Sequence, residues 1–191
     1  MSHPNRIAWL DTETTGLDEL TGSLLEVAIV ITDSDLNEVA EPFSMVVQPE
    51  DSAWKDDMGD FVVNMHTKNG LISAIESSQG SPLFEVERQA VQYLQTHCGT
   101  EDKPLLAGNS ITFDRNWLKH HAPMLFAAFH YRSIDVTSID QFITRCTQLD
   151  SINPDDTMPS DHRAVSDLRR SIAVAKHVRD SINRAFVPQA G

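Results

Sequence analysis

The sequence predicts a single α/β domain in which a mixed five-stranded sheet is flanked by helices. The first three β-rich stretches follow one another with short polar connections, which indicates an antiparallel meander. Helical patterns and short apolar stretches then alternate, as in sheets whose faces are covered by helices. The 191 residues suit one domain with a full core. We expect this domain to fill residues 1–191, with its core at about 6–182 and a C-terminal tail at 183–191.

The three strands of the meander are apolar stretches bounded by turn residues. Residues 7–10, Ile-Ala-Trp-Leu, run without polar alternation, as expected for a strand buried on both faces. The next β-rich stretches are residues 24–31 and 43–47, and the Asp-Ser-Asp-Leu-Asn run at 33–37 forms a turn between them. From 48 to 60 the pattern becomes polar and irregular.

Helices alternate with two more strands in the rest of the chain. Ser81 and Pro82 mark the start of a long helix, with the serine as its cap and the proline in its first turn. That helix ends at Cys98 and Gly99. The other expected elements are a short helix near 71–75, a strand at 105–107, a helix opened by Phe113 and Trp117, a strand at 130–136, a helix from about 138, a polar loop at 148–161 and a final helix with Ala164, Leu168, Ile172 and Ala175 on one stripe.

The composition narrows the classes of function. The net charge is −13, from 28 acidic residues against 15 Lys and Arg. A protein that binds long duplexes through many phosphates is expected to be basic, so we expect any nucleic-acid partner to be short and held through metal ions. Cys98 and Cys146 are isolated, which favours a reduced compartment. Without a signal pattern or a membrane-length apolar run, we expect a cytoplasmic protein with no membrane contact.

Two acidic residues follow the first predicted strand. Asp11 and Glu13 lie two positions apart, so they point to the same side. Two carboxylates on one face repel each other and lose solvation unless a cation lies between them. Oxygen ligands without a nearby histidine or cysteine suit a hard cation such as Mg²⁺ or Mn²⁺. Gly16 would let the chain turn and a substrate approach closely. For this motif alone, solvated acids at a strand end are the ordinary interpretation.

Three more residues are candidates for the same site as Asp11 and Glu13. Asp114 lies in the first turn of the helix after the fourth strand, near the carboxyl ends of strands where α/β sites form. Asp167 lies in the first turns of the last helix, and His162 precedes it by five residues, on the loop before that helix. Taken singly, Asp167 is also typical of an acid that favours the helix dipole, and His162 of a surface residue.

Together these residues resemble the DEDDh branch of the 3′–5′ exonucleases. Asp11 and Glu13 match its first motif, and Asp114 matches the second. The spacing of His162 and Asp167 matches the third, so the likeness spans nearly the whole chain. It implies a ribonuclease H-like fold and phosphodiester hydrolysis with two divalent cations, Mg²⁺ or Mn²⁺. By this resemblance Asp11 bridges the cations, Glu13 and Asp167 complete one shell, Asp114 holds the other cation, and His162 is the general base.

Further segments are similar to oligoribonucleases, a family that completes RNA decay by hydrolysing the shortest oligonucleotides. The departures are Phe61, where many members carry tryptophan, residues 140–146, and the first motif, which reads Asp11-Thr12-Glu13-Thr14 as in proofreading exonucleases. The similar segments are Gly108-Asn109-Ser110-Ile111 with Asp114-Arg115, His130-Tyr131-Arg132 with Asp135-Val136, His162-Arg163-Ala164, residues 32–37, and Met65-His66 with Gly70-Leu71.

The resemblance also implies a site for short single-stranded RNA, dinucleotides above all. An arginine suits a phosphate because its planar fork donates two hydrogen bonds. Core packing stays open as the alternative for Leu17 and Phe61, and a surface ion pair for Arg132. The implied contacts are Leu17 wedged between two bases, Phe61 stacked beside it, Ser110, Arg132 and Thr137 around a 5′ phosphate, and His66 at the scissile end.

A homodimer is expected as well. Oligoribonucleases resemble one another in being homodimers, with the segment that matches 130–132 near the two-fold axis. By this pattern Tyr131 of one subunit reaches the active site of the other. The apolar run at 125–129 exceeds what one helix face needs to bury, so part of it should meet the partner. The alternative is that Phe126 and Phe129 pack on the sheet.

Two other functions stay open at this point. An exonuclease of the same branch that proofreads or trims longer 3′ ends is favoured by the first motif and opposed by the acidic charge. A non-catalytic module that captures dinucleotides requires a broken acidic set, whereas all the catalytic and metal positions hold the expected residues.

Overall fold

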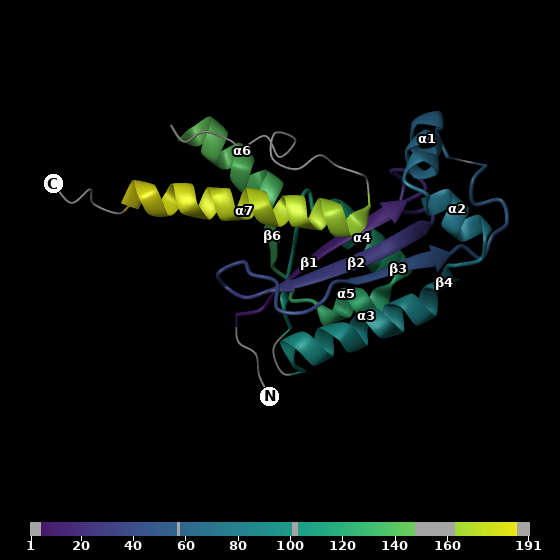
Figure 1. Ribbon diagram of the computed structural model, residues 1–191, viewed down its shortest axis with the longest axis horizontal. Coiled ribbons are helices and arrows are strands. Elements are labelled where there is room, and N and C mark those ends of the chain that lie inside the picture. Colours follow the sequence, from purple (N-terminus) through teal and green to yellow (C-terminus); the bar gives the residue numbers. More distant parts are fainter. Residues whose placement is uncertain (1–4, 57, 101–102, 148–162, 187–191) are drawn as a thin grey trace.

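A computed structural model describes residues 5–56, 58–100, 103–147 and 163–186 (Figure 1). They form a mixed α/β fold around a six-stranded sheet with the strand order β4-β3-β2-β1-β5-β6, which confirms the predicted class. The strands are β1 (Ile7–Thr14), β2 (Leu24–Thr32), β3 (Phe43–Gln48), β4 (Ser81–Pro82), β5 (Leu105–Gly108) and β6 (Ser133–Asp135). The helices are α1 (Asp60–Lys68), α2 (Leu71–Glu76), α3 (Leu83–Cys98), α4 (Thr112–His121), α5 (Pro123–Ala128), α6 (Val136–Cys146) and α7 (Ala164–Phe186).

Strand β1 lies in the middle of the sheet. It pairs antiparallel with β2 on one side and parallel with β5 on the other. β3 runs antiparallel to β2, as the meander predicts, and β6 runs parallel to β5. Because β1, β5 and β6 are parallel, their carboxyl ends point to the same edge of the sheet, where α/β proteins form their sites.

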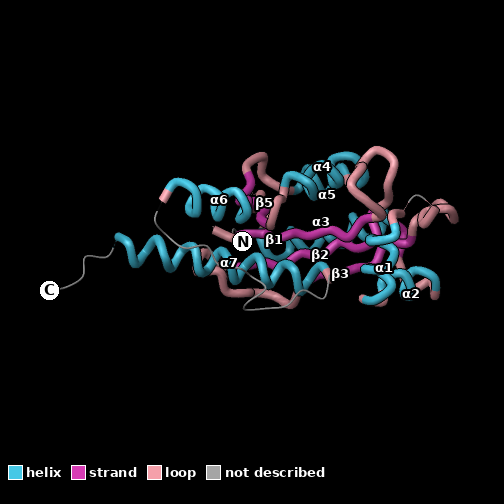
Figure 2. Tube along the Cα trace, turned by 90° about the horizontal axis from the view of Figure 1, so that it is seen from above, coloured by secondary structure: helices cyan, strands magenta, loops and turns pink. Residues whose placement is uncertain are grey.

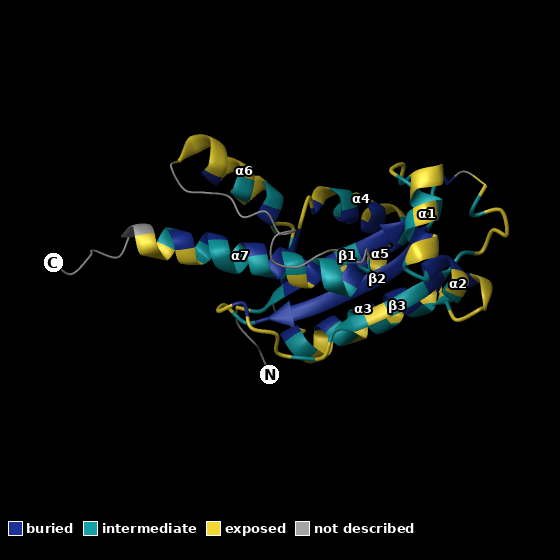
Figure 3. Cartoon of the chain, turned by 45° about the horizontal axis from the view of Figure 1, so that its top comes forward, coloured by how far each residue is buried: buried dark blue, intermediate teal, exposed yellow. Residues whose placement is uncertain are grey.

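Helices cover both faces of the sheet, and the alternation of side chains along β1 assigns each residue to a face. Ala8 and Leu10 belong to a core cluster with α3, α4 and α5, whereas Trp9 belongs to a cluster with α6 and α7. Figure 2 shows α4 and α5 on one side of the strands and α7 on the other. Strands β1 and β2 are mostly buried, while α1 and α6 carry more exposed surface (Figure 3). In the described part of the chain, no helix combines the length and apolarity needed to cross a membrane.

Several element boundaries differ from the prediction. Ser81 and Pro82 do not cap a helix but form β4, a sixth strand that pairs with the end of β3. The helix after it begins at Leu83 without a side-chain cap. β6 is only three residues long, because its pairing with β5 begins at Ser133 and residues 130–132 lie before it. The last helix continues to Phe186, so it enters the segment 183–191 that was expected to be a tail.

Two further segments correct the sequence analysis. Helix α1 follows the irregular stretch at 48–60 and was not predicted. The apolar run at 125–129 falls on α5 and its end, where Leu125 and Phe129 are buried in the core of the same chain and Phe126 packs against it. The alternative interpretation of that run is therefore correct, and its apolar side chains give no argument for a partner.

Candidate active site

Three carboxylates converge near the carboxyl end of β1. Asp11 and Glu13 lie on the same side of the strand, and Asp167 comes from the first turn of α7. One oxygen atom from each lies within 4.8 Å of the others. Helix α7 contributes to the core on the face of Trp9, which is also the face of Asp11 and Glu13. The packing of this helix therefore brings the third acid to the first two.

Burial and neighbouring charges disfavour the ionised forms of Asp11 and Glu13, whose pKa values are both raised. Burial raises the pKa of Asp11 well above its usual value, and the charge of Asp114 adds most to that rise. Burial also raises the pKa of Glu13 to about 8, and Glu26 adds to the effect. Near neutral pH Glu13 thus retains its proton unless a positive charge compensates it. Hard oxygen donors grouped this closely fit a divalent cation, whose binding would release that proton.

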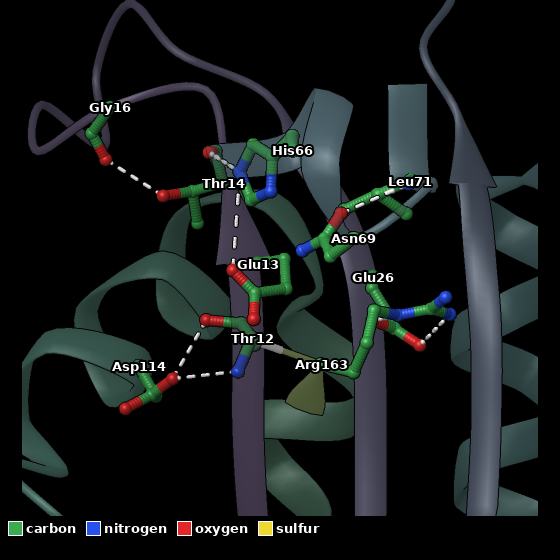
Figure 4. A network of polar contacts seen from close by, with 10 residues as sticks. All are labelled: Thr12, Glu13, Thr14, Gly16, Glu26, His66, Asn69, Leu71, Asp114 and Arg163. Carbon is green, nitrogen blue, oxygen red and sulfur yellow. Dashed lines mark hydrogen bonds and ion pairs between the residues drawn. The ribbon is translucent and has the colours of Figure 1, made fainter. Parts of the chain in front are cut away.

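Asp114 approaches the cluster from the other face of the sheet. Its Oδ1 accepts hydrogen bonds from the backbone N–H of Thr12 at 2.9 Å and from Thr12 Oγ1 at 2.7 Å (Figure 4). Burial raises the pKa of Asp114 to about 7, against the lowering effect of these bonds. The two bonds fix the first turn of α4 to the strand residue between Asp11 and Glu13.

Sequence reasoning missed a buried ion pair that borders the cluster. Glu26 lies opposite Glu13 in the β1–β2 register and is only 1% exposed. Arg163, directly before α7, donates from Nε to Glu26 Oε2 at 3.0 Å and from Nη2 to Oε1 at 2.8 Å (Figure 4). The sequence does contain a signal for this pair. Glu26 is a single acid within the apolar run at 24–31, and a buried carboxylate requires a partner.

Helix α1 is attached to the site through His66. This side chain is fully buried, and its Nε2 donates to the carbonyl oxygen of Thr14 at 3.1 Å (Figure 4). The same nitrogen lies 3.9 Å from Glu13 Oε2. In this structure His66 has no surface open to a substrate, so its contacts are with the strand end and with the carboxylate.

Leu17 and Phe61 lie at the surface instead of in the core. Their exposed fractions are 86% and 75%, which rules out core packing for both in this structure. Phe61 lies in the first turn of α1, on the helix that His66 attaches to the site. Leu17 lies in the loop between β1 and β2. That loop is held by His121, whose Nε2 donates to Glu19 O at 2.7 Å. No atom lies within 4 Å of the place that a side chain at Gly16 would take, so the backbone there is open to close approach.

Ser110 and Thr137 meet beyond the carboxyl ends of β5 and β6. The backbone N–H of Ser110 lies 3.0 Å from both Thr137 Oγ1 and Asp135 Oδ1. Asp135 also caps α6 by accepting from the N–H of Thr137. Ser110 has a φ of 48°, an uncommon backbone conformation for a residue other than glycine. The hydroxyls of Ser110 and Thr137 lie 3.3 Å apart at the surface of this corner and form a small polar platform.

Other predicted site residues are not brought to this platform. Arg132 and Tyr131 precede β6, so they lie beyond the opposite end of that strand from Thr137. Both are exposed, and the Arg132 guanidinium lies 4.9 Å from the centre of the Tyr131 ring. His162 falls outside the described residues.

Comparisons with known proteins define the class to which this fold and site belong. Residues 8–175 match the RNase_T family, described as Exonuclease. Exonuclease I from Methylocaldum szegediense superposes with a TM-score of 0.69 at 19% identity, over 95% of this chain and 42% of that one. Escherichia coli exonuclease I in complex with a dT13 oligonucleotide gives 0.66 at 18% identity, over 95% and 42%. The chain thus spans about two fifths of these exonuclease I chains, and the likeness shows their fold. The class is that of the exonucleases.

Curated relatives narrow this class. The oligoribonuclease of Streptomyces avermitilis is 36% identical over 98% of this chain and 90% of its own length. That of Corynebacterium diphtheriae is 39% identical over 93% and 84%, and that of Thiobacillus denitrificans 35% identical over 96% and 98%. The chain belongs to the oligoribonuclease family.

Proposed function

We propose that this protein is a 3′–5′ exoribonuclease that hydrolyses very short oligoribonucleotides, above all dinucleotides, to 5′-mononucleotides. The observation that carries the proposal is the convergence of Asp11, Glu13 and Asp167, with oxygen atoms within 4.8 Å of one another, in a chain of the oligoribonuclease family. The acidic net charge of −13 favours a short substrate held at this cluster over a long polyanion held on a basic surface.

The acidic residues would hold two divalent cations, Mg²⁺ or Mn²⁺. Such ions, when bound, stabilise the charge on the attacking and leaving oxygens of a phosphoryl transfer. Asp11 shares its face of β1 with Glu13 and Asp167, whereas Asp114 comes from the opposite face. This position suits a carboxylate shared by both cations.

His162 would act as the general base. It takes the proton of the attacking water as the water oxygen forms a bond to the scissile phosphorus. The bond between that phosphorus and the 3′ oxygen of the preceding nucleotide breaks, and this oxygen takes up a proton. One water is consumed, and the terminal residue leaves as a 5′-mononucleotide. His162 adjoins Arg163, whose bonds to Glu26 hold the start of α7 at the cluster.

The length preference would come from surfaces on either side of the cluster. Exposed Leu17 and Phe61 can contact two bases, because aromatic and apolar side chains that face solvent are available for stacking. The platform of Ser110 and Thr137 would receive the 5′ phosphate through its hydroxyl donors. A chain of two nucleotides would then fill the space between these contacts.

Product ladders from 5′-phosphorylated RNA of two to about ten nucleotides test this function. We expect dinucleotides to be cleaved fastest. Arg132→Ala should lower that preference by about 1.5–3 kcal/mol, the contribution of a charged hydrogen bond. Arg145→Ala, on the exposed side of α6, is the matched control and should leave the ladder unchanged. Equal rates at all lengths would instead indicate an exonuclease that trims longer 3′ ends.

Within one chain, β6 separates Tyr131 and Arg132 from the platform of Ser110 and Thr137. A homodimer would explain how they could still contact a substrate. In a two-fold assembly each copy can extend these residues to the site of the other. We expect a dimer in sedimentation, and exchange between His162→Ala and Tyr131→Ala subunits should restore about one quarter of wild-type activity. That fraction follows because half of the dimers formed at random are mixed and each mixed dimer has one complete site. A fully active monomer would refute the assembly.

A further inference from the structure

Glu26 is a buried acid without a part in the hydrolysis. It faces Glu13 across the β1–β2 ladder, where two carboxylates side by side repel each other. Its oxygens accept from Arg163 twice and from Ser44 Oγ at 2.8 Å. Burial and Glu26 both raise the pKa of Glu13, whereas Arg163 lowers it. The pair therefore compensates charge next to the cluster and also joins segments that are 137 positions apart.

Arg163 connects this acid to the third carboxylate of the cluster. Its carbonyl oxygen accepts the N–H of Asp167 at 3.1 Å, in the first turn that leads into α7. Its guanidinium is locked to both oxygens of Glu26, a geometry that fixes direction as well as distance. On the other side, Arg170 Nη1 donates to Asp167 Oδ1 at 3.1 Å. The position of Asp167 relative to β1 thus depends on where Arg163 is held on β2.

We propose that Glu26 and Arg163 are positioning residues, whose bidentate pair holds the start of α7 on the sheet so that Asp167 completes a cation site with Asp11 and Glu13. The proposal rests on the proposed function for the identity of the site. The proposal adds to that site two residues, Glu26 and Arg163, that would contact neither the substrate nor a cation. Partners of this kind, one contact removed from the ligands, typically change metal affinity by about 10- to 100-fold when they are replaced.

The helix offers a matched control. Arg169, also on α7, donates from Nε and Nη2 to both oxygens of Glu38, at 2.9 and 3.0 Å. This pair has the same bidentate geometry, but it lies at the exposed end of the connection from β2 to β3 and away from the cluster. Arg169→Met removes the same kind of pair from the same helix without touching the site.

Mn²⁺ binding to the whole protein, measured by the paramagnetic resonance of free Mn²⁺ in the absence of substrate, tests the proposal. Arg163→Met should weaken binding about 10- to 100-fold, and hydrolysis should recover when Mn²⁺ is raised by the same factor. Arg163→Lys keeps the charge but not the fork, so an intermediate affinity is expected. Arg169→Met should bind as the wild type does.

The double variant Glu26→Gln/Arg163→Met separates positioning from simple charge compensation, and it removes the unpaired buried acid if Arg163→Met alone fails to fold. Weak binding in the double variant supports positioning, whereas wild-type affinity in it, or in Arg163→Met, overturns the proposal. An equal loss in Arg169→Met also overturns it. Wild-type protein that binds Mn²⁺ but cleaves no RNA would refute only the proposed function, and absence of binding would refute both.

Discussion

Asp11→Asn should abolish hydrolysis, by roughly 10³-fold or more, while raising the thermal stability of the metal-free protein at pH 8. The activity falls because the substitution removes the charge shared by the two cations but keeps the volume of the side chain. The stability rises because burial and the charge of Asp114 already disfavour ionised Asp11. Calorimetry in chelator measures the stability, and RNA hydrolysis with Mn²⁺ measures the activity, on two portions of one protein preparation.

Buried Glu13 also makes the stability of the metal-free protein depend on pH, with a defined sign. The folded pKa of Glu13, about 8, lies above the usual value near 4.3, so the folded state binds more protons than the unfolded state between these limits. The associated stability is complete below pH 4, is lost as the pH rises through about 8, and should be restored by a divalent cation. Asp35→Asn, the same change on an exposed turn, should alter neither activity nor this profile. Near-normal activity in Asp11→Asn would contradict the two-cation assignment.

His162→Ala should slow hydrolysis by about 10²–10⁴-fold and flatten the acid side of the pH–rate profile. An unperturbed imidazole titrates near pH 6.5, so a histidine base loses its function as the pH falls below that value. His120→Ala, on the exposed side of α4, is the matched control and should keep the wild-type profile. An unchanged profile in His162→Ala would assign the base to another group.

The three antiparallel strands, and the alternating helices and strands after them, were predictable because buried strands appear in the sequence as apolar runs. β2 is buried along its whole length, and its sequence shows this. Helix α1 left no such trace, because it packs through the buried His66 and partly buried valines while Phe61 faces solvent. β4 could not be predicted either. Ser81 and Pro82 carry the local signals of a helix start, and only pairing with β3 makes them a strand.

The site also contains contacts that the sequence predicts and contacts that it does not. The meeting of Asp11 and Glu13 with Asp167 follows from strand alternation and from the helix order, both of which a sequence expresses. The pairing of Glu26 with Arg163 depends on which strand the last helix crosses, and sequence spacing does not contain that information. The same holds for Arg132 and Thr137. They are near in sequence, but the short strand β6 places them beyond its opposite ends.

The late arrival of α7 has a consequence for the protein during its synthesis. β1 and β2 leave the ribosome early, carrying Asp11, Glu13 and Glu26, whereas Asp167 and the arginine that binds Glu26 follow only with the last helix. Contacts between such distant segments form late, because the chain between them must first be made and ordered. A nascent chain with this order of elements carries Glu26 without its arginine, and Asp11 and Glu13 without the third carboxylate. The cluster of three carboxylates can therefore form only after the whole chain up to its last helix has been made.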